Sequence, residues 1–146
     1  MSSMASTTIY RSYSEDETKE IGRRLGNTCA SGTVISLRGP LGAGKTVIAK
    51  GVAEALGITE AIVSPTFTLV QEYEGSMHLH HMDLYRIDGV EEFGGIGGEE
   101  LLYGEGITLI EWSEKIEPIL PAHTVRLSIA IESDGSRTIT VTGVEP

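Results

Sequence analysis

The chain has 146 residues, of which 40% are hydrophobic and 22% charged, and this length and composition predict one globular domain, residues 1–146. Its formal net charge is −10, with 11 basic residues dispersed among 21 acidic ones, which argues against direct binding of DNA or RNA because phosphate contacts need Lys and Arg. No apolar run approaches the length of a membrane span, and the polar N-terminus lacks the features of a secretory signal. The single cysteine, Cys29, permits no internal disulfide, so we expect a small buried apolar side chain and a cytoplasmic protein.

The first predicted helix has a clear start signal. Ser14 stands before three consecutive acids, so its hydroxyl can cap the first backbone amides, and Glu17 completes a capping box. Apolar residues at a spacing of four mark the buried face of this helix: Ile21, Leu25 and Cys29. Ahead of the helix, the sequence predicts a disordered tail at residues 1–6 and a short edge strand at residues 7–10.

A strand, a glycine-rich loop and a second helix come next. Residues 33–37 (TVISL) are apolar and β-branched, as in a buried strand. The helix predicted over residues 45–56 has one apolar face and ends at Gly57. This order of strand, loop and helix is the context that a phosphate-binding loop requires.

The second half of the chain alternates strand and helix patterns. Residues 67–74 and 77–82 predict a hairpin around Gly75, and residues 90–102 predict a loosely helical or mobile segment because four glycines interrupt it. The later predictions are a buried strand at 107–111, a short helix at 112–117 stopped by Pro118 and Pro121, and strands at 123–131 and 136–142 joined by a turn at Asp134 and Gly135. Together these elements predict a P-loop NTPase-like α/β fold, in which a mixed sheet has a parallel core, additional antiparallel hairpins and helices on both faces.

The glycine-rich loop, residues 39–46 (GPLGAGKT), matches G-x-x-x-x-G-K-[ST] at every required position. Glycines let backbone amides approach phosphate oxygens, Lys45 can reach the β- and γ-phosphates, and Thr46 can offer its hydroxyl to Mg²⁺. The alternative is a glycine turn that caps an ordinary helix. We expect ATP rather than GTP, because no Asn/Thr-Lys-x-Asp segment follows the loop. The expected phosphate-binding residues are Gly39, Leu41, Gly42, Ala43, Gly44, Lys45, Thr46 and Val47.

A P-loop protein also needs an acid at the end of a neighbouring strand, to hold Mg²⁺ or to orient water. Glu111 ends the strand predicted at 107–111, and Asp83 follows the strand predicted at 77–82. Each could instead be a solvated acid at a strand end. Thr66 lies in a loop after the P-loop helix, where it could sense the γ-phosphate as a switch residue or could cap its own turn.

Three histidines, one arginine and the single tryptophan allow further interpretations. His78 and His80 share one face of a strand, but no cysteine or fourth ligand pairs with them at a recognised zinc spacing. They and His81 are therefore interpreted as histidines of a solvated or edge face. Arg86 could stabilise transition-state charge or be a surface arginine, and Trp112 is expected to pack in the core or in an interface.

Four blocks occur in a fixed order along the chain: GPLGAGKT, SPTFTLVQEY, HMDLYRID and LIEW. Together they resemble the TsaE family (older name YjeE), small bacterial ATPases of tRNA threonylcarbamoyladenosine biosynthesis, and the resemblance covers residues 8–142. It implies a P-loop α/β domain with extra antiparallel strands that binds ATP and Mg²⁺. The implied site residues are Lys45, Thr66, Asp83 and Glu111 for catalysis, Thr46, Glu111 and Asp83 for Mg²⁺, and, from blocks that match more loosely, Ser14, Glu15 and Arg137 for the nucleotide. Residues 93–98 (FGGIGG) depart from the family in being unusually rich in glycine.

The resemblance also implies how the ATPase is used. TsaE-like proteins act with TsaB and TsaD, which transfer threonylcarbamoyl to adenosine 37 of tRNAs that read ANN codons, and they meet tRNA only through that complex. ATP hydrolysis by the chain alone is then expected to be slow. Two alternatives stay open: a small-molecule kinase of the P-loop class, which would need a lid with several arginines, and a nucleotide sensor without turnover.

Overall fold

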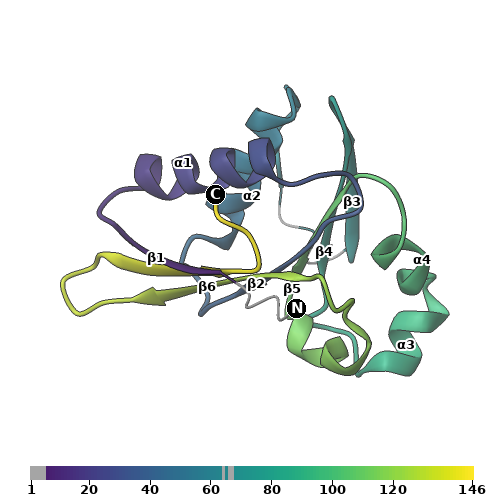
Figure 1. Ribbon diagram of the computed structural model, residues 1–146. Coiled ribbons are helices and arrows are strands. Elements are labelled where there is room, and N and C mark those ends of the chain that lie inside the picture. The colour runs from purple at the N-terminus through teal and green to yellow at the C-terminus, as the bar shows by residue number, and fades with distance from the viewer. Residues whose placement is uncertain (1–5, 64, 66–67) are drawn as a thin grey trace.

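The computed structural model describes residues 6–63, 65 and 68–146. Within these residues one sheet is formed by the strands β1 (Thr7–Ser12), β2 (Val34–Arg38), β3 (Val70–Glu74), β4 (His78–Asp83), β5 (Ile107–Glu111), β6 (Val125–Ile131) and β7 (Arg137–Thr142). Their order across the sheet is β1-β7-β6-β2-β5-β4-β3 (Figure 1). The neighbours β6, β2, β5 and β4 are parallel, whereas β3 pairs antiparallel with β4, and β7 pairs antiparallel with β6 and β1. The predicted parallel core with antiparallel hairpins is confirmed.

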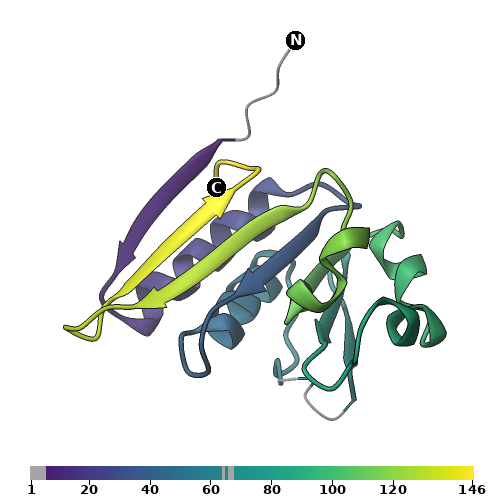
Figure 2. The same ribbon diagram turned by 90° about the horizontal axis from the view of Figure 1, so that it is seen from below.

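Helices lie on both faces of this sheet, as predicted. The described helices are α1 (Glu15–Thr28), α2 (Lys45–Ala55), α3 (Val90–Gly95), α4 (Gly98–Leu102) and the 3₁₀ helix η1 (Ser113–Ile119). Helices α1 and α2 cover one face, and α3, α4 and η1 lie on the other (Figures 1 and 2). Each face has its own apolar core, with Leu25 and Ile48 in the first and Phe93 and Ile110 in the second. None of the helices in the described part of the chain is long and apolar enough to cross a membrane.

The start and the buried face of α1 agree with the sequence pattern. The Ser14 hydroxyl accepts a hydrogen bond from the amide of Glu17 (3.1 Å), and the Glu17 carboxylate accepts one from the amide of Tyr13 (2.6 Å). The predicted inward residues are at most 6% exposed: Ile21, Leu25 and Cys29. The capping contacts fix the first turn of α1, which later forms one wall of the candidate site.

Glycines bring α1 and α2 into direct backbone contact. A Cβ atom on Gly22 would lie 2.4 Å from the carbonyl oxygen of Ile48, and one on Gly51 would lie 2.2 Å from that of Lys19. A side chain at either glycine would therefore push the two helices apart. The helix pattern in the sequence did not indicate this contact, because it depends on the distance between the two helices.

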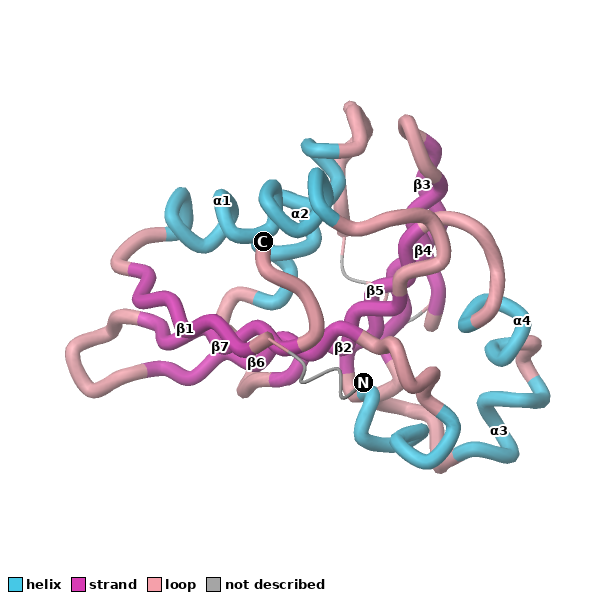
Figure 3. Tube along the Cα trace, viewed as in Figure 1, coloured by secondary structure: helices cyan, strands magenta, loops and turns pink. Residues whose placement is uncertain are grey.

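Two predicted helices differ from the structure. The segment predicted at 90–102 forms the separate helices α3 and α4, with the break at Ile96 and Gly97 (Figure 3). Gly97 adopts φ 78°, a left-handed conformation that interrupts a helix. The prediction that Pro118 stops a helix at residue 117 is wrong, because η1 continues through it. The backbone of η1 leaves helical geometry at Ile116, so Pro118 lies in the first turn of the next segment, where its missing N–H has little effect.

Some strand boundaries also shift. Strand β3 begins at Val70, because Leu69 has φ 67° and is not extended, and residue 67 of the predicted strand lies outside the described residues. Strand β6 begins at Val125 rather than at residue 123, because the amide of Thr124 closes a turn on the carbonyl oxygen of Pro121 (3.0 Å). Residues 1–5 of the predicted tail lie outside the described residues.

Candidate functional site

A cleft of about 550 Å³ opens where β2, β4 and β5 reach their carboxyl ends. Its walls come from the P-loop between β2 and α2, the first turn of α1, the ends of β4 and β5, and the turn between β6 and β7. This volume suits a nucleotide-sized ligand, and the carboxyl edge of a parallel sheet is the usual place for one. The predicted site residues that line it are Ser14, Glu15, Leu41, Gly42, Ala43, Gly44, Lys45, Thr46, Val47, Asp83, Glu111 and Arg137.

The P-loop backbone needs glycine at two positions. Gly42 has φ 81° and Gly44 has φ 120°, values that side chains other than hydrogen rarely tolerate. Gly44 is also the N-cap of α2 and provides no side chain to cap it, so the first amides of the helix remain available to an anion. Gly39 packs against β6 instead, where a Cβ atom would lie 2.8 Å from the carbonyl oxygen of Ile129.

Arg137 braces this loop from the opposite wall. Its Nε donates to the carbonyl oxygen of Ala43 (2.9 Å) and its Nη2 to that of Gly42 (3.2 Å), while Nη1 contacts the carbonyl oxygen of Gly135. The turn before Arg137 is held by Asp134, whose carboxylate accepts hydrogen bonds from the hydroxyl and the amide of Ser136, and these bonds hold the pKa of Asp134 below its usual value. Arg137 therefore supports the loop that would hold the nucleotide.

The two candidate acids lie side by side. Asp83 and Glu111 are register partners in the parallel pair β4–β5, and each is 5% exposed. The Nζ atom of Lys45 lies 3.8 Å from Oε1 of Glu111, so the P-loop lysine faces one of these acids directly. Asp83 also accepts a hydrogen bond from the amide of Tyr85 (2.9 Å), which fixes its carboxylate.

His81 is a site residue to which the sequence pattern gave no role in the cleft. It is fully buried, and its Nε2 donates to Oε2 of Glu111 (2.8 Å). The interpretation of His81 as a histidine of a solvated or edge face is therefore wrong. A signal was present in the sequence, because His81 and Asp83 are two residues apart and so share one face of their strand.

Trp112 both packs against the second core and lines the cleft. Its ring lies 5.1 Å from Nζ of Lys45 and 5.1 Å from the ring of Tyr85. Its backbone adopts φ 61°, an uncommon conformation for a large residue that places it at the start of η1. Trp112 therefore does more than pack in the core, because its ring also contacts the lysine of the P-loop.

Other cleft residues were not predicted as site residues from the sequence. They are Ser12, Tyr13, Thr18 and Gly135. Thr18 lies one turn after Ser14 on α1, so the capping pattern at the start of this helix could have indicated it. Arg86 is not among the described residues that line the cleft, and Thr66 lies outside the described residues.

The donor set of the cleft fits a hard divalent cation. Thr46 offers a hydroxyl, and Asp83 and Glu111 offer carboxylate oxygens, which are the ligands that Mg²⁺ prefers. A thiol nucleophile is absent from the cleft residues described, since Cys29 is buried in the first core and burial raises its pKa to about 11. The arrangement is therefore suited to phosphate and Mg²⁺ rather than to covalent catalysis by cysteine.

Comparison with known proteins gives a consistent result. The family model described as "Threonylcarbamoyl adenosine biosynthesis protein TsaE" matches residues 12–139. The tRNA threonylcarbamoyladenosine biosynthesis protein TsaE of Treponema pallidum is 45% identical over 130 residues, which are 89% of this chain and 96% of that protein. The protein of the same name from Bacillus subtilis is 41% identical over 136 residues, 92% of this chain and 85% of that one.

A solved structure agrees with the sequence relatives. The crystal structure of Bacillus subtilis YdiB matches with a TM-score of 0.82 and 37% identity, covering 99% of this chain and 90% of that one. The fold is therefore shared along nearly the whole chain, and the resemblance carried by the four sequence blocks is confirmed. The chain belongs to the TsaE family of tRNA threonylcarbamoyladenosine biosynthesis proteins.

Proposed function

We propose that the chain is the Mg²⁺-dependent ATPase subunit that supports threonylcarbamoylation of adenosine 37 in tRNAs reading ANN codons. The observation that carries this proposal is the contact of Lys45 with the buried Glu111, whose neighbour on the adjacent strand is the buried Asp83, in a cleft built on a P-loop. Membership of the TsaE family supports the pathway, and the chemistry of the cleft supports the activity.

The P-loop and the two acids of the cleft have separate roles in this proposal. The loop amides and the first amides of α2 bind the phosphates of ATP, and Lys45 exchanges its contact with Glu111 for phosphate oxygens. Thr46, Asp83 and Glu111 would hold Mg²⁺, and the ion would supply positive charge against the phosphates. Asp83, Glu111 and Thr66 are the candidates for orienting the attacking water.

We assign the completion of this site to TsaB and TsaD. Arg137 is the one arginine among the described residues that line the cleft, and its nitrogens already contact the carbonyl oxygens of the loop. The chain alone therefore supplies little positive charge for the developing transition state beyond Lys45, and turnover by the isolated chain is slow. Because the chain is acidic, tRNA is held by the partners, in the cytoplasm.

The test is reconstitution with TsaB, TsaD, tRNA and the threonylcarbamoyl donor, with ATP hydrolysis and modified adenosine measured together. Lys45→Ala and Glu111→Gln each lower turnover by about 10²-fold or more, because each removes a charge that acts on the transferred phosphoryl group. The matched control is Lys50→Ala, an exposed lysine of the same helix, which leaves both readouts unchanged.

Three results would contradict the proposal. Equal ATPase rates with and without TsaB and TsaD would remove the role of the partners. A phosphorylated metabolite, detected with labelled ATP and a metabolite pool, would indicate a small-molecule kinase. Full tRNA modification by Glu111→Gln without ATP turnover would indicate a nucleotide sensor.

A further inference from the structure

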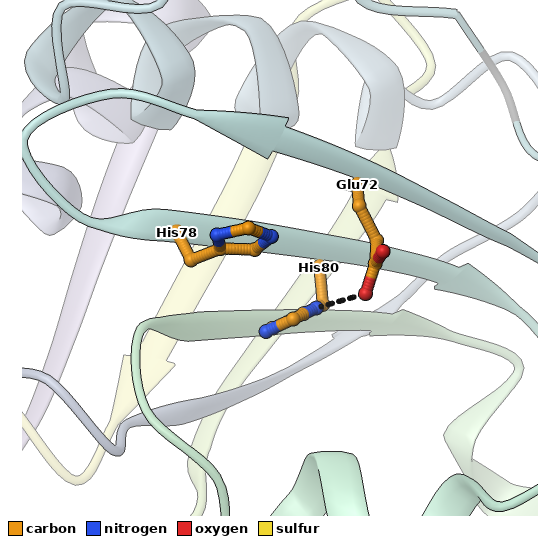
Figure 4. Close-up of side chains that lie close together, drawn as sticks. All are labelled: Glu72, His78 and His80. Atoms are coloured by element: carbon orange, nitrogen blue, oxygen red, sulfur yellow. Dashed lines mark hydrogen bonds and ion pairs between the residues drawn. The ribbon is translucent and has the colours of Figure 1, made fainter.

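One face of the hairpin β3–β4 gathers histidines and carboxylates outside the nucleotide cleft (Figure 4). The two strands pair antiparallel, with Glu72 opposite His80 and Glu74 opposite His78. Residues directly opposite in an antiparallel pair project to the same side, and so do residues two apart in one strand. The hairpin therefore presents two imidazoles and two carboxylates on one face.

The distances on this face suit a shared metal ion. One ligand atom from each of Glu72, His78 and His80 lies within 4.8 Å of the other two. The Nδ1 atom of His80 is 3.1 Å from Oε1 of Glu72, and Nδ1 of His78 is 3.4 Å from Oε1 of Glu74. Two ligand atoms on one tetrahedral zinc ion are about 3.4 Å apart, given bonds of about 2.0–2.1 Å.

The exposure of the side chains allows them to move the remaining distance to a shared ion. The side chain of His80 is 11% exposed and forms a fixed point, whereas those of His78 and Glu72 are 35% and 56% exposed and can rotate towards it. Figure 4 shows the three side chains on the same side of the hairpin, with Glu72 reaching from β3 towards the histidines of β4. Rotation of the exposed His78 and Glu72 side chains around His80 can therefore bring the ligand atoms together.

We propose that Glu72, His78 and His80 bind a divalent transition-metal ion of the Zn²⁺ class. Imidazole together with carboxylate favours Zn²⁺, Cu²⁺ or Ni²⁺ over Mg²⁺, which prefers oxygen ligands. Glu74 or water fills the fourth position of a tetrahedral site. From their spacing in the sequence, these histidines were expected to lack further ligands. The register of the hairpin supplies them, because it brings carboxylates from the neighbouring strand.

This site is separate from the proposed ATPase site. Along β4, His78 and His80 point to one face, while His81 and Asp83 point to the other, towards Glu111 and the cleft. A metal ion on the hairpin would link the edge strand β3 to β4 without contacting the nucleotide. Its binding is therefore measured without ATP and does not depend on the proposed function.

The experiment is a calorimetric titration of Zn²⁺ into the chelator-treated full chain, without a histidine tag and without nucleotide. Wild type binds one equivalent, and Zn²⁺ raises its melting temperature. His78→Gln and Glu72→Gln each weaken this binding by at least about tenfold and lose the rise in melting temperature. Co²⁺ in place of Zn²⁺ gives visible absorption bands for wild type that His78→Gln lacks. His78 and Glu72 are used because they are partly exposed, so their variants fold.

Two control variants make the outcome decisive. His123→Gln changes an exposed histidine away from the hairpin, and Glu111→Gln changes an acid of the cleft. Both retain the one-equivalent Zn²⁺ site. The proposal is overturned if wild type binds no Zn²⁺, which leaves His80 and Glu72 as a hydrogen-bonded pair only, or if His78→Gln and Glu72→Gln bind Zn²⁺ as wild type does.

Discussion

Lys45 faces a carboxylate in this structure, at the place where the proposal puts ATP. The side chains of Lys45 and Glu111 are only 8% and 7% exposed, so each would be unfavourable to leave unpaired. In the proposed function, phosphates that bound Lys45 would take this partner from Glu111, which would then be available to Mg²⁺. The hydrogen bond from His81 does not depend on Lys45, so it can hold the Glu111 carboxylate during the exchange.

A substitution of His81 tests this positioning role. His81→Ala removes the donor to Glu111, and we expect kcat for ATP in the TsaB–TsaD complex to fall by about 10- to 100-fold, because partners of metal ligands contribute effects of that size. The apparent Mg²⁺ affinity should fall as well, whereas KM for ATP should change less. His81→Gln, whose amide can reach the same carboxylate, should restore much of the activity.

Because His81 is fully buried, stability is measured in parallel. If the alanine and glutamine variants lose the same activity, and their melting temperatures are similar to each other, the hydrogen bond to Glu111 does not matter. His81 then has only a packing role. His123→Ala is the control for loss of an imidazole elsewhere.

Some contacts of the site could be predicted from the sequence, and others could not. The P-loop spacing indicated Lys45 and Thr46, and the ends of apolar strands indicated Asp83 and Glu111 as candidates. That these acids are neighbours depends on the pairing of β4 with β5, which local patterns do not encode. The contact of Arg137 with Ala43 likewise joins segments far apart in the chain, and only the folded topology brings them together.

At the scale of elements, the packing of α1 on α2 determines the position of one cleft wall. The first turn of α1 brings Ser14, Glu15 and Thr18 to the cleft, while α2 begins at Lys45. Gly22 and Gly51 let the two helices approach to backbone contact. These glycines lie in helices, where glycine is unfavourable by about 1 kcal/mol relative to alanine. The close packing of the two helices therefore outweighs the low helix propensity of glycine.

This contact predicts opposite effects for two glycine-to-alanine substitutions. Gly22→Ala should lower the free energy of unfolding by about 1–3 kcal/mol, because the new methyl group meets the backbone of α2. Gly94→Ala in α3 is the matched control, since a Cβ atom there has no neighbour closer than 3.9 Å, and it should raise stability by up to about 1 kcal/mol. Urea unfolding measures both. Equal stabilities for Gly22→Ala and wild type would contradict the close contact.

At the scale of the whole molecule, the cleft is assembled from segments spread along the chain. The start of α1, the P-loop, the ends of β4 and β5 and the turn before β7 all line the one cleft. Periodicity predicted the strands and helices, but the strand order comes from pairing between distant segments, as in β2 with β5. The glycines at 94–98 lie away from this assembly, in α3, α4 and the turn between them.

The charge of the whole chain leads to the final prediction, on tRNA. The formal net charge is −10, and basic residues of α1 are already paired with acids, Lys19 and Arg23 with Glu54 and Arg24 with Glu20. A basic protein binds nucleic acid more tightly as salt falls, because it releases counterions from phosphates. This chain should gain no tRNA binding as salt falls, since lower ionic strength lengthens the range of repulsion between two polyanions.

Electrophoretic mobility shifts with labelled tRNA test how tRNA binding depends on salt. The chain alone should give no shift at about 0.15 M salt or at about 0.05 M, whereas the mixture with TsaB and TsaD should shift the tRNA at the higher salt. Arg24→Glu, at an exposed position of α1, should leave the shift by the complex unchanged. Binding by the chain alone that strengthens as salt is lowered, and that Arg24→Glu weakens, would instead indicate a direct tRNA surface on α1. In that case the contact with tRNA would not be left to the partners.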